Sequence, residues 1–158
     1  MNKRDFLKLV FALTGLASLV PFLPYSQFFS YGSNPKIERK KIANISQLKP
    51  HSFIIFLWPT ETHPYHTNIL IRGPGGGVGP TGDLVAYNRV CTHLQCLVNY
   101  DPETDQLPCP CHGSIYNALN GNVVSGPAQK ALPKIDLEVD ANGDIYAVNI
   151  EGEIGVGR

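Results

Sequence analysis

Two short segments hold all four cysteines of this 158-residue chain, together with two of its five histidines. The first, Cys-Thr-His-Leu-Gln-Cys, begins at Cys91, and the second, Cys-Pro-Cys-His-Gly-Ser-Ile-Tyr, begins at Cys109. Cys91 and His93 are too close in sequence to share one face of a helix, so both must project from a loop. Two thiolates with two imidazoles suit either zinc or a two-iron cluster with mixed ligands. The spacing therefore predicts a metal centre held between two loops.

These segments resemble the two cluster-binding motifs of Rieske iron–sulfur proteins and match them at every ligand position. The resemblance implies one [2Fe–2S] cluster of Rieske type as the cofactor. The implied ligands are Cys91, His93, Cys109 and His112. The other two cysteines, Cys96 and Cys111, are implied to form a disulfide that clamps the two loops together. A structural zinc site is the remote alternative, and it would leave these two cysteines without a role.

The same resemblance assigns roles to residues that follow the second motif. Ser114 and Tyr116 match hydroxyl groups that donate hydrogen bonds to cluster or cysteine sulfur. Gly126 and Pro127 lie in a Gly-Pro-Ala segment that is similar to the proline loop covering the cluster in this family. Such hydrogen bonds favour the more negative reduced state, so we expect them to raise the reduction potential. No catalytic residue is expected, because the chain is a one-electron relay.

Short apolar or alternating runs recur after residue 42, and none keeps a helical period for three turns. Five of them predict strands: Ser52–Trp58, Thr67–Arg72, Leu84–Asn88, Ile135–Val139 and Ile145–Ile150. Asn120-Gly121 and Asn142-Gly143 predict hairpin turns, and glycine-rich residues 73–82 predict a surface loop. We therefore expect an all-β fold. The resemblance specifies an antiparallel β sandwich or barrel with a small cluster-binding subdomain over about residues 89–128.

The N-terminal part of the chain has the layout of a targeting segment. Residues 3–8, Lys-Arg-Asp-Phe-Leu-Lys, resemble the twin-arginine export motif with lysine in place of the first arginine, and an apolar run follows over residues 9–23. We expect residues 1–35 to be an export signal or a retained membrane anchor, residues 36–41 a basic linker, and residues 42–158 the Rieske domain. The domain is then expected in the periplasm or on the outer face of the cytoplasmic membrane.

The charge of the chain argues against a nucleic-acid partner and is compatible with a membrane or a protein partner. The net charge is zero, with 13 Lys and Arg against 13 Asp and Glu, which argues against nucleic-acid binding. Nine of these cations and three of the anions lie in residues 1–82, whereas four cations and ten anions lie in residues 83–158. This asymmetry fits two solvated surfaces, or a basic stalk at a membrane with an acidic head that docks to a partner.

Sequence outside the two motifs is most similar to the small subunit of arsenite oxidase. The similar stretches are residues 74–80, Pro-Gly-Gly-Gly-Val-Gly-Pro, residues 83–87, Asp-Leu-Val-Ala-Tyr, and the C-terminal residues 152–158. This resemblance implies a large molybdopterin-containing catalytic subunit as one partner and a cytochrome or other soluble protein as the electron acceptor. Ser114 and Tyr116 instead resemble the Rieske subunit of quinol-oxidising cytochrome bc complexes, whose partner is cytochrome b.

Overall fold

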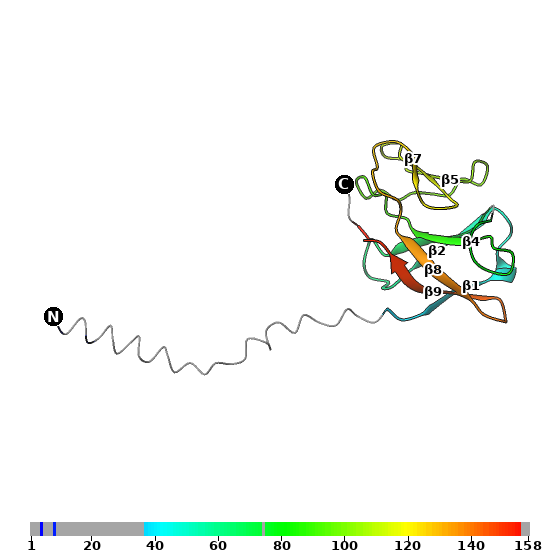
Figure 1. Ribbon diagram of the computed structural model, residues 1–158, viewed down its shortest axis with the longest axis horizontal. Coiled ribbons are helices and arrows are strands. Elements are labelled where there is room, and N and C mark those ends of the chain that lie inside the picture. Colours follow the sequence, from blue (N-terminus) through cyan, green and yellow to red (C-terminus); the bar gives the residue numbers. More distant parts are fainter. Residues whose placement is uncertain (1–3, 5–7, 9–36, 74, 156–158) are drawn as a thin grey trace. The chain divides into compact units, whose positions relative to one another are not determined.

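Nine β-strands form two antiparallel sheets in the part of the chain that the computed structural model describes, which is residues 37–73 and 75–155 with Arg4 and Lys8 (Figure 1). The larger sheet has six strands in the order β1-β9-β8-β4-β3-β2. They are β1 (Lys40–Asn44), β2 (Ser52–Leu57), β3 (Thr67–Arg72), β4 (Leu84–Asn88), β8 (Lys134–Val139) and β9 (Asp144–Glu151). The smaller sheet has the order β5-β6-β7, with β5 (Gln106–Pro108), β6 (Ile115–Asn117) and β7 (Val123–Ser125). A single turn of 3-10 helix, η2 (Ile45–Gln47), follows β1.

The central strands β3 and β4 are buried on both faces. Alternate side chains of a strand point to opposite faces of its sheet. Leu70 and Ala86 accordingly pack into one core, and Ile69 and Tyr87 pack into a second core on the other face. This burial on both faces explains why residues 69–71 of β3 and 84–87 of β4 are consecutive apolar residues rather than alternating with polar ones.

The second core lies between the large sheet and the small one. The segment that carries β5, β6 and β7 is inserted between β4 and β8, and it forms a separate lobe on one side of the large sheet (Figure 1). Leu107 of β5 and Tyr116 of β6 are fully buried against the same cluster that holds Ile69 and Tyr87. Both cysteine-containing segments belong to this lobe, so its packing against the central strands positions them.

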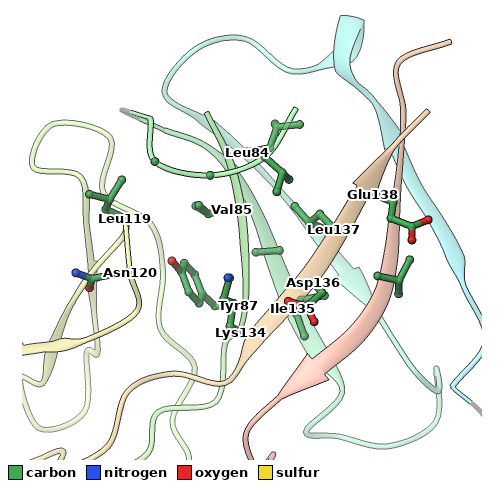
Figure 2. A pocket seen from close by; sticks show the side chains of 15 residues that line it. Leu84, Val85, Tyr87, Leu119, Asn120, Lys134, Ile135, Asp136, Leu137 and Glu138 are labelled. Carbon is green, nitrogen blue, oxygen red and sulfur yellow. The ribbon is translucent and has the colours of Figure 1, made fainter. Parts of the chain in front are cut away.

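A groove opens where β4 and β8 diverge. The two strands are paired through Tyr87 and Lys134 alone, and beyond this pair a groove of about 700 Å³ separates them. Figure 2 shows the Tyr87 hydroxyl directed toward the loop that carries Leu119 and Asn120. That hydroxyl is buried without a hydrogen-bond partner in the described structure, and burial raises its pKa to about 12.

The expected all-β, antiparallel fold is confirmed. The strands predicted at 67–72 and 84–88 have these same bounds, and the other three agree to within one residue at each end. Asn142-Gly143 forms the turn between β8 and β9, where the Gly143 N–H donates to Asp140 O at 3.0 Å. Asn120-Gly121 lies in the turn between β6 and β7, and the glycine-rich residues join β3 to β4.

One predicted boundary was wrong. The sequence places Lys40 and Lys41 in the basic linker, but both belong to β1 and pair with Ala147 and Tyr146 of β9. Lys41 is exposed and its Nζ contacts the Asp144 carboxylate at 2.5 Å, which keeps its charge at the surface of the sheet. The strand β1 therefore begins within the run of basic residues that the sequence predicts to be a linker.

The export signal or anchor expected for residues 1–35 lies outside the described residues, apart from Arg4 and Lys8. Among the residues that are described, the structure contains no helix with the length and hydropathy needed to cross a membrane.

Candidate metal centre

The two cysteine-containing loops share one backbone design. In the first, the Cys91 N–H donates to Cys96 O at 2.7 Å and the Gln95 N–H donates to Cys91 O at 2.9 Å. In the second, the Cys109 N–H donates to Ser114 O at 2.7 Å and the Gly113 N–H donates to Cys109 O at 3.2 Å. Each loop is thus closed by two hydrogen bonds at the same relative positions, and each begins with a buried cysteine.

The four cysteines separate into one disulfide and two free thiols. Cys96 and Cys111 are joined across the two loops, with their Cα atoms 6.4 Å apart. Cys91 and Cys109 are free and buried. The Cys109 sulfur lies within 4.8 Å of both disulfide sulfurs, but sulfur atoms in a disulfide are not thiolate ligands. The thiols available to a metal are therefore those of Cys91 and Cys109.

The two motif histidines lie next to each other. The ring centroids of His93 and His112 are 4.9 Å apart, and the ring planes are nearly perpendicular at 88°. The Nδ1 atom of His93 is buried and has no hydrogen-bond partner among the described residues. An unpartnered buried nitrogen is costly unless something binds it, so this atom has the environment expected of a metal ligand.

The hydroxyl of Tyr116 connects to the first loop. Its oxygen lies 3.1 Å from Cys91 Sγ and accepts a hydrogen bond from the Thr92 N–H at 3.0 Å. The Thr92 hydroxyl is also 3.1 Å away, but it donates its own hydrogen to Lys130 O at 2.6 Å. Burial is the main reason that the pKa of Tyr116 is raised to about 12, so the hydroxyl keeps its hydrogen at neutral pH and can donate it to Cys91.

The two free thiols differ in acidity. Burial opposes ionisation of Cys91, but hydrogen bonds from Tyr116, the His93 backbone and other neighbours together hold the pKa of Cys91 below its ordinary value. Burial is the first cause of a raised pKa at Cys109, and the adjacent Cys91 adds to it. Without a cation, a thiolate at Cys91 thus disfavours ionisation of Cys109. Metal binding requires both thiols to be ionised.

The segment after β7 packs against the second loop. The Ala128 N–H donates to Ser114 Oγ at 3.1 Å, and Ser114 is fully buried. Gly126 has a φ of 93°, and a Cβ built on it would lie 2.5 Å from Ser114 Cα. Pro127 borders a cavity of about 230 Å³ that is also lined by His93. The segment therefore contacts the second loop through Ser114 and shares a cavity with His93 of the first.

These donors fit a two-iron cluster. Two buried thiols and two adjacent imidazoles, one of which has a buried nitrogen without a partner among the described residues, lie on two loops that a disulfide joins. The same four ligands would also satisfy zinc by number.

Sequence reasoning did not identify every residue that organises this centre. Gln95 and Tyr65 are joined by a hydrogen bond of 2.6 Å from the tyrosine hydroxyl to the glutamine Oε1. Tyr65 lies 30 residues away in the loop between β2 and β3, and no spacing rule connects it to the motif. A comparison of the two motifs could have identified Gln95. It is the fifth residue of the first motif, where the second motif has a glycine, Gly113.

Comparisons with known proteins agree on one family. Residues 41–136 match the family described as the Rieske [2Fe-2S] domain. The iodate reductase subunit IdrB of Denitromonas iodatirespirans is 36% identical over 161 aligned residues, which cover 98% of this chain and 83% of that protein. The cytochrome b6-f complex iron-sulfur subunit of Prochlorococcus marinus (strain MIT 9215) is 47% identical over 74 residues, covering 46% of this chain and 39% of that protein. The soluble domain of the Rieske protein II (soxF) from Sulfolobus acidocaldarius superposes with a TM-score of 0.61 at 28% identity, covering 77% of this chain and 84% of that one.

Proposed function

This chain belongs to the Rieske [2Fe-2S] domain family, and from that premise we propose that it is the electron-transfer subunit of an oxidoreductase whose large subunit contains molybdopterin and acts on an oxyanion. Its cofactor is one [2Fe–2S] cluster, which excludes the zinc alternative. The chain transfers electrons within a complex and carries out no bond-making chemistry of its own. Arsenite and iodate are the two oxyanions to test first.

Four residues are proposed to hold the cluster: Cys91 and Cys109 on one iron, and His93 and His112 on the other. For His93 the ligand atom is the buried Nδ1. When bound, the cluster accepts and releases one electron at a time. The chain's own residues fix the two loops, exclude water from the thiols and donate the Tyr116 hydrogen to Cys91. His112 is exposed, so it marks the side on which an electron-transfer partner can approach.

The observation that carries the choice of complex is the extent of similarity along the chain. Similarity to the iodate reductase subunit extends over 98% of this chain. Similarity to the cytochrome b6-f subunit is higher in identity but is confined to 46% of the chain. Cluster-binding motifs are shared across the family, whereas the remainder of the chain contacts partners that differ between complexes. Full-length similarity therefore supports an oxyanion oxidoreductase, with a cytochrome or other soluble protein as the second electron partner.

A Rieske subunit of a quinol-oxidising complex is the second candidate. Ser114 and Tyr116, with the contacts described above, are the observations that favour it, and cytochrome b would then be the partner. In either complex we propose export to the outer side of the cytoplasmic membrane. The twin-arginine-like start and the Cys96–Cys111 disulfide support this location, because disulfides persist in oxidising compartments.

The ligand set is tested by replacing single cysteines and measuring iron, labile sulfide and the paramagnetic resonance of the reduced protein. We expect Cys91→Ser and Cys109→Ser to abolish the cluster. Cys96→Ser should retain it but release it faster, since a disulfide that closes a 15-residue loop contributes about 3 kcal/mol. Equal loss of the cluster in all three variants would show that ligands and clamp are wrongly assigned.

The complex is tested by isolating the tagged full-length chain from its native host. We expect a large molybdenum-containing protein to co-purify, and the cluster to be reduced by arsenite or oxidised by iodate only when that protein is present. The cytochrome bc alternative predicts co-purification with cytochrome b and reduction by quinol, with no response to either oxyanion. That second pattern would overturn the proposal.

A further inference from the structure

Gln95, in the first metal-binding loop, has a backbone conformation that residues with a Cβ rarely adopt. Its φ is 65°, in the left-handed region that favours glycine. The second loop provides a comparison within the same molecule, because Gly113 has a φ of 74° and makes the equivalent backbone hydrogen bond. Both loops therefore require a left-handed residue at this point. A glutamine there is unfavourable unless its side chain compensates for the strain.

The side chain of Gln95 is held at both ends of its amide group. Its Oε1 accepts a hydrogen bond of 2.6 Å from the Tyr65 hydroxyl, in the loop between β2 and β3. Its Nε2 donates a hydrogen bond of 2.5 Å to Gly155 O, in the segment after β9. Gln95 thus connects the first metal-binding loop to two segments that lie 30 and 60 residues away in the sequence.

Tyr65 and Gly155 also contact each other, so the three residues form a closed triangle. Gly155 has a φ of 74°, and a Cβ built on it would lie 2.8 Å from the Tyr65 ring, which shows that this backbone packs directly on the ring. The Tyr65 backbone is anchored as well, because the fully buried amide of Asn88 donates to Tyr65 O at 2.7 Å. The other end of that amide, Asn88 Oδ1, accepts from the Val90 N–H at 3.1 Å. Asn88 therefore links the triangle to the end of β4, the strand that leads into the first metal-binding loop.

We infer that Gln95 is a positioning residue that fixes the loop carrying His93. The inference rests on the proposed function, since it concerns how His93 is presented to the cluster. His93 lies two residues before Gln95, inside the turn from Cys91 to Gln95 that the Gln95 N–H closes by donating to Cys91 O. Gly113, with no side chain, gives the second loop no equivalent tether. The disulfide joins both histidine-bearing loops. Beyond it, Gln95 ties the first loop to Tyr65 and Gly155, whereas the segment at Gly126 packs on the second.

The first test replaces Gln95 with glycine, which removes the tether and also relieves the backbone strain. We expect the temperature of unfolding to stay the same or rise, because glycine tolerates this φ. The cluster should nevertheless be lost about tenfold faster to an iron chelator, since two hydrogen bonds that hold the loop are absent. The paramagnetic resonance lines of the reduced protein should broaden as the orientation of His93 becomes less uniform. A general loss of structure would lower stability together with cluster retention, so opposite changes identify positioning.

The second test replaces Tyr65 with phenylalanine, which keeps the ring on Gly155 and removes only the hydroxyl. We expect cluster loss about threefold faster than in the unchanged protein, because one of the two hydrogen bonds is lost. The double variant should lose the cluster no faster than Q95G, since both changes act through one contact. Tyr146→Phe is the matched control, because that hydroxyl contacts Asp140 on the β8–β9 hairpin, and it should leave the rate unchanged.

In the cluster-free protein, hydrogen exchange provides a readout that does not depend on iron. The Cys91 amide, which donates to Cys96 O, should exchange faster in Q95G and in Y65F than in the unchanged protein. Unchanged exchange, chelator rate and resonance line width in both variants would overturn the inference while leaving the cluster assignment intact. A parent protein that takes up zinc and no iron would instead overturn the proposed function, and the exchange measurement would still decide whether Gln95 fixes the loop.

Discussion

The hydroxyl of Tyr116 illustrates how one atom can influence both folding and electron affinity. It has a single hydrogen, and the Thr92 hydroxyl has already donated its own hydrogen to Lys130 O. A metal-bound cysteine sulfur has no hydrogen to offer, so toward the Tyr116 hydroxyl it can only be an acceptor. The same oxygen accepts from the buried Thr92 N–H. The hydroxyl therefore stabilises negative charge on Cys91 and pairs a backbone donor at the same time.

Tyr116→Phe should lower the reduction potential and, separately, the stability of the fold. If about 1 kcal/mol of the hydrogen bond to sulfur distinguishes the reduced from the oxidised state, the potential falls by about 40 mV. The unpaired Thr92 N–H should cost about 1–3 kcal/mol in the free energy of unfolding. A redox titration and a urea titration measure the two effects.

Tyr100→Phe is the control for this change, because Tyr100 is also buried in the small lobe but its hydroxyl bonds to Asp105. It should lower stability and leave the potential unchanged. A potential that is the same in the Tyr116 variant and the parent would mean that the hydroxyl does not donate to sulfur.

At the scale of elements, the segment after β7 holds the second loop by close backbone contact. A Cβ at Gly126 would meet three backbone atoms of Gly113 and Ser114 between 2.5 and 2.8 Å. None of these atoms can move without moving the loop that carries Cys109 and His112. This contact and the hydrogen bond from the Ala128 N–H to Ser114 Oγ fix the segment against the second loop.

Gly126→Ala is therefore expected to displace the second loop and weaken cluster retention. The cost should be about 2–4 kcal/mol in the free energy of unfolding, from the positive φ together with overpacking. Gly75→Ala is the matched control, since its φ is 114° but a Cβ there meets nothing within 4 Å. It should cost about 1 kcal/mol and leave the cluster unaffected. Chelator kinetics and urea unfolding give the comparison, and equal effects of the two substitutions would contradict the role of Gly126.

Elements were predictable from sequence where side-chain periodicity or composition carried the signal. The consecutive apolar residues within 67–72 and 84–88 predict β3 and β4 because these strands are buried on both faces. The strands β5, β6 and β7 have three residues each, which is too short for a period of two to be recognised. These strands form because the lobe packs over Ile69 and Tyr87. That contact joins segments distant in the sequence, so no local pattern predicts it.

For the candidate site, the sequence predicted only what its two local motifs contain. The two motifs name residues that lie in local loops, and the disulfide that the resemblance implied, Cys96–Cys111, is present in the structure. Thr92, Gln95 and Tyr65 were not singled out. Gln95 and Tyr65 act through contacts between distant segments, and no local pattern encodes such contacts.

At the scale of the whole molecule, the pairing of Arg72 with Asp83 links stability to pH. Burial opposes ionisation of Asp83, but hydrogen bonds from Arg72 and Thr81 outweigh it and hold the pKa of this carboxyl below its ordinary value. Arg72 Nε donates to Asp83 Oδ2 at 2.8 Å, and Arg72 also donates to Leu48 O. Together they close the base of the long loop between β3 and β4.

A carboxyl group with a lowered pKa stabilises the fold above its unfolded-state pKa of about 3.9 and loses that contribution as pH falls through the folded-state value. Asp83→Asn should therefore be less stable than the parent at neutral pH, and the difference should shrink in acid below about pH 4. Urea titrations from pH 7 to 3 measure this, with exposed Glu103→Gln as a control. A difference that stays constant over this range would show that the charge of Asp83 is unimportant.

The pairing of β1 with β9 sets the order in which this domain can form. Lys40 pairs with Ala147, and at about 5–20 residues per second the ribosome reaches the second of these residues roughly 5–20 s after the first. The neighbouring strands β2, β3 and β4 pair in sequence order and can assemble during that interval, followed by the lobe with both cysteine loops. β1 has no partner until the last hairpin emerges. During translation, the six-stranded sheet can therefore be completed only after every residue of the metal centre has been synthesised.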